Sequence, residues 1–290
     1  MKKVSIIGAG IGGLVSAILL SKKGYDVTVF EKNGNPGGKM NQVYLDKFRY
    51  DIGPSLITMP FILEDFFREA GRKLSDYVTL KRLNINCKYF YPDGTVFNAY
   101  NDLEKFRNEI ESTFGTLTLN EFDKYFSYSE KLYNLSAESF LFNPFSIKRF
   151  FNINGLKNAG KFLSSKSLHK LHQEFISNKK FIQFLDRFAT YNGSNPFMAP
   201  SLFSIIPYVE IKFGGFYVEN GIYKLAESLA NICEEENIPL KWDYRFLGIE
   251  KNQKEINVIK VKGPDEKIEN IEQDYVVSNI TNDISLTGSK

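Results

Sequence analysis

Hydrophobic and polar positions at the start of the chain follow two periodicities, one typical of strands and one typical of helices. Residues 4–7 (VSII) have the pattern of a buried strand, and residues 14–23 have the periodicity of a helix that would end at Gly24. Residues 26–30 (DVTVF) alternate as a second strand, which ends directly before Glu31. A strand, a helix and a further strand in this order predict a βαβ unit.

The pattern becomes mainly helical after this unit. Residues 61–71 and most of residues 101–190 have helical periodicity, while residues 85–100 predict a hairpin of two aromatic-rich strands. An amphipathic helix is expected over residues 221–238. Short strands are expected after it, near residues 241–249, 256–262 and 275–278.

These elements predict an α/β fold in which one domain interrupts another. A Rossmann-like domain is expected over residues 1–60 and 215–290, because the βαβ unit needs further strands to complete its sheet. Residues 61–214 are expected to form an inserted, mainly helical substrate domain.

A glycine motif lies where the first strand would turn into the helix. Gly8, Gly10 and Gly13 have the spacing of a dinucleotide-binding turn, and Glu31 lies at the distance that this fingerprint requires. Gly8 would allow the tight turn, Gly10 would let the backbone approach a pyrophosphate, and Gly13 would let the helix pack on the strand. Glu31 would accept hydrogen bonds from the hydroxyl groups of an unphosphorylated adenosine ribose.

A second glycine pair, Gly37-Gly38, follows the acid and is itself followed by Lys39. A nicotinamide enzyme does not need such a pair, whereas an extended FAD molecule can bring its pyrophosphate close to a second backbone loop. The pair therefore favours FAD over NAD. The alternative at this point is a loop whose glycines serve turn geometry alone.

Composition excludes some classes of function. The 290 residues carry a net charge of +3, which gives no indication of nucleic-acid binding, and 43% of them are hydrophobic. Cys87 and Cys233 are too few for a disulfide framework. The apolar N-terminal run is interrupted by glycines and followed by SKKG, which argues against a signal peptide or a membrane span.

Several stretches resemble one enzyme family, the carotenoid (phytoene-type) desaturases, which are FAD-dependent members of the amine-oxidase-like flavoprotein group. They are GAGIGGL, FEKNGNPGGKMNQV, YDIGPSLITMP, YNGSNPFMAPSLFSIIPYVE, GGFYVENGIYKLAESLA and DYVVSN. The stretches CKYFYPDGTVFNAYNDLEKF and RFATYNGSNP are most similar to the branch that acts on hydroxylated carotenoids. The resemblance extends over essentially the whole chain.

The resemblance implies which residues hold FAD. The positions matching its ADP half are Gly8, Gly10, Gly12, Gly13, Glu31, Lys32, Gly38 and Lys39. Gly53, Pro54 and Ser55 match a loop near the flavin ring, and Phe246 matches a position whose backbone meets the adenine. Two positions depart from the family pattern: Lys39 stands where arginine is usual, and Asn220 stands where the first of two glycines is frequent.

The resemblance further implies a desaturase that removes two hydrogens from a carotenoid C–C bond and passes a hydride to the flavin. No residue is singled out as a catalytic acid or base. The alternatives are a polyene isomerase or saturase, an amine oxidase of the same group, or a non-catalytic truncated or split-gene fragment. In the family a long segment follows the stretch DYVVSN, so we expect this chain alone to be inactive and to need a complementing C-terminal fragment.

A basic and aromatic stretch, residues 145–181, is the last feature that bears on partners. It can lie on an anionic membrane surface, which would make the protein cytoplasmic and peripheral on the inner face of the membrane, or it can be a solvated face over a phenylalanine core. His169 and His172 lie within it without an acid or cysteine pattern nearby. We expect two surface histidines there and no metal site.

Overall fold

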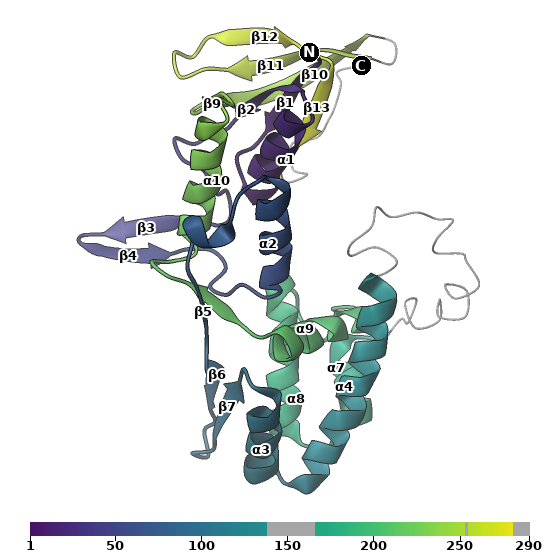
Figure 1. Ribbon diagram of the computed structural model, residues 1–290. Helices are drawn as coiled ribbons and strands as arrows, with labels where there is room; N and C mark the ends of the chain where they lie inside the picture. Colours follow the sequence, from purple (N-terminus) through teal and green to yellow (C-terminus); the bar gives the residue numbers. More distant parts are fainter. Residues whose placement is uncertain (138–165, 253–254, 281–290) are drawn as a thin grey trace. The chain divides into compact units, whose positions relative to one another are not determined.

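The computed structural model describes residues 1–137, 166–252 and 255–280, which fall into two compact units (Figure 1). Unit 1 comprises residues 1–81 and 216–290, and unit 2 comprises residues 82–215. Residues 61–81, which the sequence had assigned to the inserted domain, are grouped with unit 1. The reason is packing: Phe66 and Phe67 lie in the same hydrophobic core as the first strand and helix.

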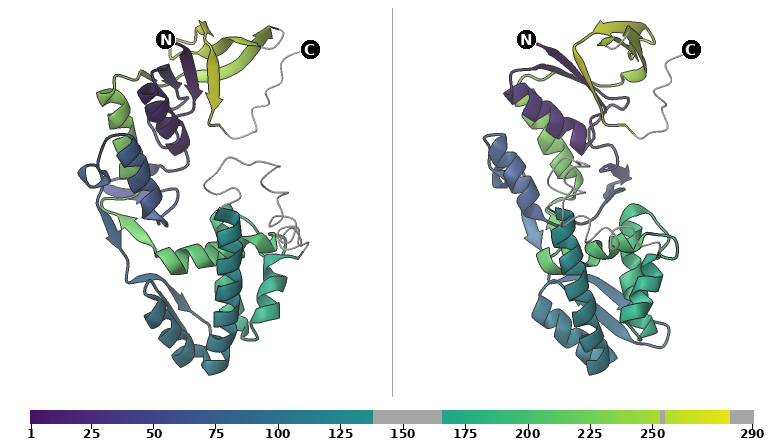
Figure 2. Two further views of the ribbon diagram at one scale, coloured as in Figure 1. Left: turned by 45° about the vertical axis from the view of Figure 1, so that its right-hand side comes forward. Right: turned by 90° about the vertical axis from the view of Figure 1, so that its right-hand side faces the viewer.

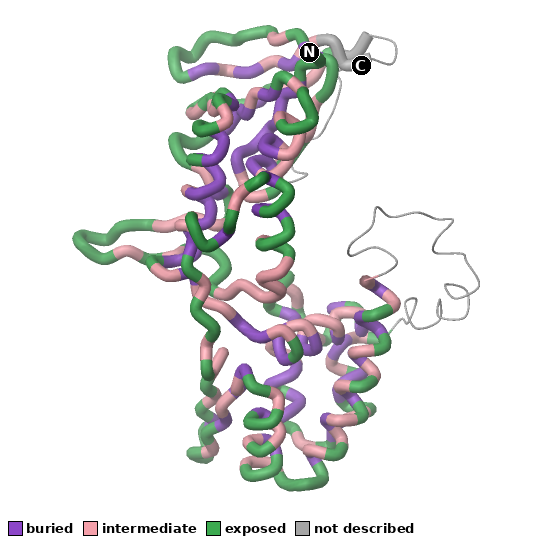
Figure 3. The backbone as a smooth tube through the Cα atoms, in the orientation of Figure 1, coloured by how far each residue is buried: buried purple, intermediate pink, exposed green. Residues whose placement is uncertain are grey.

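The core of unit 1 is a parallel sheet with the strand order β13-β1-β2-β9. Its strands are β1 (Lys3–Ile7), β2 (Asp26–Phe30), β9 (Leu240–Lys241) and β13 (Tyr275–Ser278). The helices α1 (Ile11–Lys22) and α10 (Tyr223–Glu235) lie side by side against it (Figures 1 and 2). Ile6, Leu14, Ile18 and Ile232 are fully buried in the core of this unit. Figure 3 colours the buried stretches of the backbone purple. The predicted α/β class is confirmed.

Unit 1 contains further elements besides this sheet. An antiparallel sheet consists of β10 (Arg245–Asn252), β11 (Glu255–Lys262) and β12 (Ile268–Glu272). A hairpin consists of β3 (Gln42–Leu45) and β4 (Phe48–Asp51), and the strands β5 (Leu80–Arg82) and β8 (Phe216–Val218) pair with each other. The helices here are α2 (Pro60–Glu69) and the short 3-10 turn η1 (Leu74–Asp76).

Unit 2 is mainly helical, as the pattern predicted. The hairpin of β6 (Ile85–Phe90) and β7 (Val96–Tyr100) is followed by α3 (Leu103–Phe114) and α4 (Thr116–Ser136), which Gly115 separates at φ 89°. The remaining described elements are α7 (Leu168–Phe175), α8 (Lys179–Asp186), η3 (Arg187–Asn192), η4 (Ser201–Ser204) and α9 (Ile205–Phe213). Asn143-Pro144 and Gly155, where the sequence predicts breaks in the helical pattern, lie outside the described residues.

Helix starts in unit 2 follow from side-chain caps. Asp102 accepts a hydrogen bond from the N–H of Lys105, Ser167 from that of Lys170, and Asn178 from the first turn of α8. Such caps satisfy backbone donors that have no partner within the helix. They explain why these short helices begin where they do.

Phenylalanine rings fill the centre of unit 2. Phe97, Phe106, Phe122, Phe181 and Phe184 have no exposed surface and contact one another with ring centroids about 5–6 Å apart. Because these rings are fully enclosed, they form the core of the unit and do not line an open path.

Candidate cofactor site

The first part of the site is the turn between β1 and α1, which is shaped by its glycines. Gly8 has φ +100°, a region that favours glycine, and its N–H donates to the carbonyl of Phe30 at 2.8 Å. A Cβ on Gly13 would lie 2.0 Å from the carbonyl oxygen of Gly8, so only glycine lets α1 pack this closely on the strand end. Gly10 caps α1 without any side-chain hydrogen bond, which leaves the first-turn N–H groups available to an anion.

Glu31 stands at the end of β2 and is only 6% exposed. Its Oε2 accepts a hydrogen bond from the N–H of Ala9 at 2.8 Å, and its Oε1 accepts from the N–H and Nδ2 of Asn33 at 3.0 and 2.8 Å. The carboxylate therefore ties the glycine turn to the end of the second strand. Oε2 can accept a further bond, whereas Oε1 already accepts two, so the ribose contact expected of Glu31 stays a prediction that this geometry permits through Oε2.

Gly37 and Gly38 lie directly against the first glycine turn. The N–H of Gly37 donates to the carbonyl of Ala9 at 2.8 Å, and a Cβ on Gly37 would lie 2.2 Å from the carbonyl oxygen of Met40. Gly38 has φ +58°, and a Cβ there would lie 3.4 Å from Cα of Gly10. The absence of a side chain at Gly37 is thus required by the protein's own backbone. Gly38, in contrast, is exposed, and both glycines border the cavity described next.

A cavity of about 930 Å³ lies over these two loops within unit 1. It collects eight of the predicted residues: Gly8, Gly10, Glu31, Lys32, Gly38, Lys39, Pro54 and Phe246. The predicted residues Gly12, Gly13, Gly53 and Ser55 are outside this lining. Gly53 instead packs on the backbone, because a Cβ there would lie 2.1 Å from the carbonyl oxygen of Lys39.

Several lining residues were not predicted, namely Tyr244, Arg245, Ser278, Asn279 and Ile280. Arg245 adds a cation to those of Lys32 and Lys39, so positive side chains outnumber the single carboxylate of Glu31. A hydrogen bond to Glu269 at 3.1 Å, together with burial, raises the pKa of Tyr244, which keeps its hydroxyl protonated. Asn279 was open to prediction, because ligands bind beyond the carboxyl ends of parallel strands and Asn279 directly follows β13.

Asn220, the second departure from the family pattern, adopts φ +66°. Asparagine tolerates this left-handed conformation better than most side chains do. Gly221 follows at φ +94° and lies against the guanidinium of Arg49. The turn before α10 therefore keeps a left-handed backbone with asparagine in the first position.

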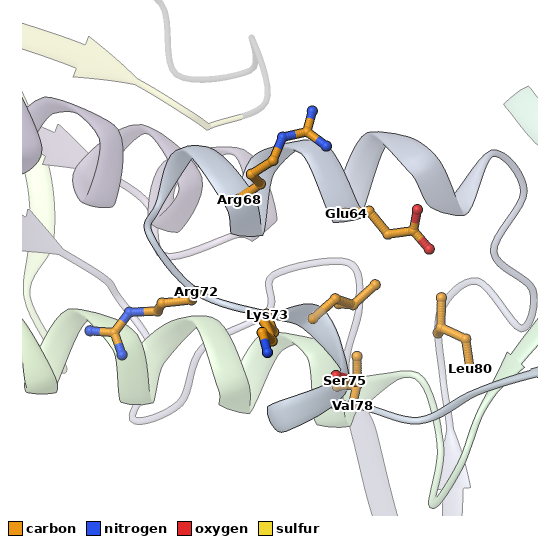
Figure 4. Close-up of a pocket in the computed structure, with 8 residues that line it drawn as sticks. Glu64, Arg68, Arg72, Lys73, Ser75, Val78 and Leu80 are labelled. Atoms are coloured by element: carbon orange, nitrogen blue, oxygen red, sulfur yellow. The ribbon is translucent and has the colours of Figure 1, made fainter.

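A second hollow, of about 540 Å³, lies between α2 and η1 (Figure 4). Arg68, Arg72 and Lys73 approach it, with Leu74, Val78 and Leu80 on the apolar side. Arg72 is engaged by Glu235 and Glu236, and Arg68 pairs with Asp65 at 2.5 Å. Since both guanidinium groups are neutralised by carboxylates, this hollow offers an anion much less than the glycine-lined cavity does.

The two histidines of unit 2 share one carboxylate, that of Asp186, and are not both on the surface. His172 is fully buried, its Nδ1 lies 2.7 Å from Oδ1 of Asp186, and its Nε2 lies 3.1 Å from the hydroxyl of Tyr125. His169 contacts the other oxygen of Asp186 at 2.6 Å. The expectation of two surface histidines is therefore wrong: His172 is buried and the side chain of His169 is only 20% exposed. The acid that holds them lies 14 residues after His172 and 17 after His169, so no local pattern indicated it. Among the described residues, no cluster of three His, Cys, Asp or Glu side chains is placed to hold a metal.

The chain matches one protein family over most of its length. The model for flavin-containing amine oxidoreductases matches residues 11–285. The chain belongs to the flavin-containing amine oxidoreductase family. FAD is the cofactor that this membership assigns. The glycine-lined cavity fits the ADP half of FAD, because two glycine-containing loops can approach the pyrophosphate, three cations can balance its charge, and an acid lies at the end of β2.

Named relatives narrow the resemblance to carotenoid enzymes. The chain is 31% identical to 4,4'-diapolycopene oxygenase of Methylomonas sp over 283 residues, which cover 96% of this chain and 56% of the relative. It is 35% identical to 1-hydroxycarotenoid 3,4-desaturase of Flavobacterium sp. over 260 residues, which cover 89% of this chain and 51% of the relative. The chain thus spans about half the length of these relatives. The resemblance to carotenoid desaturase-like flavoproteins is confirmed.

Solved structures support the same fold at low sequence identity. A putrescine oxidase variant aligns with a TM-score of 0.64 at 16% identity and covers 96% of this chain and 58% of its own. An oxidoreductase from Methanosarcina mazei aligns with a TM-score of 0.59 at 18% identity, over 97% of this chain and 59% of its own. At these identities the likeness bears on the fold alone.

Proposed function

We propose that this chain provides the FAD-binding part of an oxidoreductase that desaturates a carotenoid. The observation that carries the proposal is the glycine-lined cavity at the ends of β1, β2 and β13, in a chain that belongs to a flavoprotein family and has carotenoid enzymes among its relatives. Its substrate would be a long polyene, and no nucleic acid is expected to bind.

When bound, FAD supplies an acceptor for the hydride that leaves one carbon, while a proton leaves the neighbouring carbon and a C=C bond forms. The described residues would contribute binding and orientation. The carboxylate of Glu31 would fix the ribose, the first turn of α1 would hold the pyrophosphate, and the cations of Lys32, Lys39 and Arg245 would balance its charge. A saturated carbon chain offers no acidic proton, so exclusion of water and alignment matter more than an acid or base.

The direct test is cofactor binding followed by product analysis. Purified chain should bind FAD in preference to NAD, and Glu31→Gln should weaken FAD by about tenfold or more, because a charge-assisted hydrogen bond contributes about 1.5–3 kcal/mol. Tight NAD binding without FAD binding would contradict the proposal. A matched control is Glu272→Gln, which neutralises an exposed acid of the same unit on β12.

Oxygenation of a polyene is a second candidate, because one of the relatives is named an oxygenase. Expression in a carotenoid-producing host separates the two: desaturation yields a product that has lost two hydrogens, whereas oxygenation yields one that has gained oxygen. The remaining alternatives are a polyene isomerase or saturase and an amine oxidase, and they would leave the carotenoid with neither change.

Two further parts of the proposal concern partners. The activity is proposed for the protein together with a complementing C-terminal fragment, and co-expression with and without the second half of a relative tests this. Without it we expect no new product, and a new product from residues 1–290 alone would show that none is needed.

Peripheral contact with the inner face of the membrane, through residues 145–181, is also proposed. Residues 145–165 of this stretch lie outside the described residues. Among the helices that are described, none has the length and hydrophobicity needed to cross a bilayer. Replacing Lys157, Lys161, Lys166 and Lys170 with Gln should reduce flotation with anionic vesicles, most clearly at low salt.

A further inference from the structure

The side chain of Asn279 covers the glycine turn that precedes α1. Its Nδ2 lies 2.9 Å from the position that a Cβ of Gly10 would occupy and 3.2 Å from that of Gly13. Its Oδ1 lies 2.9 Å from the corresponding position at Gly12. One carboxamide thus lies within 3.2 Å of the positions that a Cβ would take at three glycines, so it borders the turn where the cavity opens.

The strand register brings Asn279 to this place. β13 runs parallel to β1 with Ser278 beside Ile7, and the N–H of Asn279 donates to the carbonyl of Ile7 at 2.8 Å. Asn279 is therefore the first residue beyond the strand end, level with the turn. A main-chain bond fixes its backbone, and the side chain is left to meet the cavity.

Within the described part of the chain, the Asn279 amide has no hydrogen-bond partner of its own. The residue is exposed, and it belongs to the lining of the glycine-lined cavity. Beside it, α1 begins at Gly10 with no side-chain cap and no acidic residue in its first turn. An amide donor therefore adjoins a row of uncapped backbone donors, an arrangement that suits an anion with several oxygens.

We propose that Asn279 is a cofactor-contacting residue whose side-chain N–H donates a hydrogen bond to the pyrophosphate of FAD. This inference rests on FAD occupying the cavity, as proposed above. The amide then extends the anion site of the α1 turn from the strand side. A purely structural Asn279, one that only fills space over the glycines, would affect stability without distinguishing ligands by their phosphates.

The test compares ligands that share adenosine and differ in the pyrophosphate. Binding of FAD, ADP and adenosine is measured by calorimetry on the full chain for wild type, Asn279→Ala and Asn279→Asp. Asn279→Ala should weaken FAD and ADP about tenfold, the loss of one hydrogen bond to a charged group. Asn279→Asp has the same shape but brings a negative charge to the pyrophosphate, so it should weaken both ligands further. Adenosine binding should change less than about twofold with either variant.

The control is Asn270→Asp, which makes the same charge change at an exposed position of β12 in the same unit, outside the cavity lining. It should leave all three affinities unchanged. Circular dichroism and thermal unfolding establish that each variant is folded. If Asn279→Asp is unstable, the affinities of Asn279→Ala for the three ligands decide the test. Equal weakening of ADP and adenosine, or no weakening of either, would overturn the inference while leaving FAD binding intact. If wild type binds neither FAD nor ADP, the proposed function fails together with it.

Discussion

The cofactor cavity of unit 1 and the buried polar groups of unit 2 are built from different parts of the polypeptide. In unit 1, the backbone makes the site: two glycine turns meet through a main-chain hydrogen bond, and a carboxylate ties the first turn to the end of β2. In unit 2, side chains from separate helices meet in the interior, as Arg187 of η3 does with Glu210 of α9 at 2.9 and 3.1 Å. Backbone sites are sensitive to added atoms, whereas side-chain pairs are sensitive to the loss of one partner.

The largest effect is expected from breaking the buried ion pair of unit 2. Arg187→Met leaves the Glu210 carboxylate, whose side chain is 2% exposed, without its cation. An uncompensated buried charge costs about 3–5 kcal/mol, so the free energy of unfolding of unit 2 should fall by that amount. Hydrogen–deuterium exchange resolved by peptide should show the loss in unit 2 and little change in unit 1.

Two variants check that the burial of the pair is the cause. Arg107→Met removes a half-exposed ion pair with Asp123 and should cost about 1 kcal/mol or less. The double variant Arg187→Met/Glu210→Met should recover most of the lost stability, because no charge is then left buried alone. A double variant no more stable than the single one would mean that the pair also organises its neighbours.

In unit 1, a large loss of stability is expected from one added methyl group at Gly37. Gly37→Ala places a Cβ 2.2 Å from the carbonyl oxygen of Met40 at φ +106°, and we expect it to cost about 3 kcal/mol or more. Gly24→Ala is the matched control, because Gly24 also has a positive φ, +84°, but has nothing within 4 Å of the added Cβ. It should cost only the conformational strain, about 1–2 kcal/mol.

Denaturant unfolding followed by the fluorescence of Trp242, the single tryptophan, reports on unit 1 directly. Equal losses for the two alanine variants would mean that a positive φ alone requires glycine at position 37. A greater loss at Gly37 would show that the carbonyl of Met40 excludes a side chain there, so that this glycine serves the geometry of its own loop.

The same contrast explains what the sequence could predict. The βαβ unit and its glycines follow local rules, so β1, α1, β2 and Glu31 were found from spacing alone. β3 and β12 were missed, because each is an exposed strand that forms only by pairing with its neighbour and carries little apolar alternation.

Side-chain partners distant in sequence could not be found in this way. Asp186 holds His172 from another helix, and that contact leaves no local pattern. Asn279 could be expected at the cavity as the residue after a predicted strand, but its contact with the glycine turn depends on the pairing of the last strand with the first. The phenylalanines of unit 2 were visible in the composition, but their mutual packing was not.

The stability of unit 2 should also depend on pH, more weakly than on the ion pair. Burial lowers the pKa of His172, although its hydrogen bond to Asp186 opposes the shift. The unfolded chain, with an ordinary histidine pKa of about 6.5, then takes up more protons than the folded chain as the pH falls below that value. Stability is therefore complete above about pH 6.5 and declines below it, by at most about 1.4 kcal/mol per pH unit.

Urea unfolding between pH 5 and 7.5, resolved by unit, measures this slope. The charged and titratable groups that face His172 are Asp186, His169 and Tyr125. His172→Gln should flatten the profile, while His169→Gln should leave most of it. Both histidines of the chain are in unit 2, so a comparable decline in unit 1 over the same range would count against this origin.

The smallest effect is expected at Lys39, where the cavity of unit 1 depends on a side chain. Lys39 is exposed and lines the cavity, at a position where the family resemblance leads one to expect arginine. An ammonium meets a phosphate as a point charge, whereas a guanidinium offers a planar pair of donors that matches two oxygens. Because water competes at an exposed position, Lys39→Arg should tighten FAD binding by only about two- to fivefold, and Lys39→Gln should weaken it by a similar factor.

Calorimetry at two salt concentrations measures both changes in FAD affinity, and the difference between the variants should shrink at high salt. Lys81→Gln, which removes a cation paired with Glu219 in the same unit, is the control and should change neither affinity nor its salt dependence. If Lys39→Arg instead weakened FAD, the lysine would have to be fitted to this cavity in a way that charge alone does not explain.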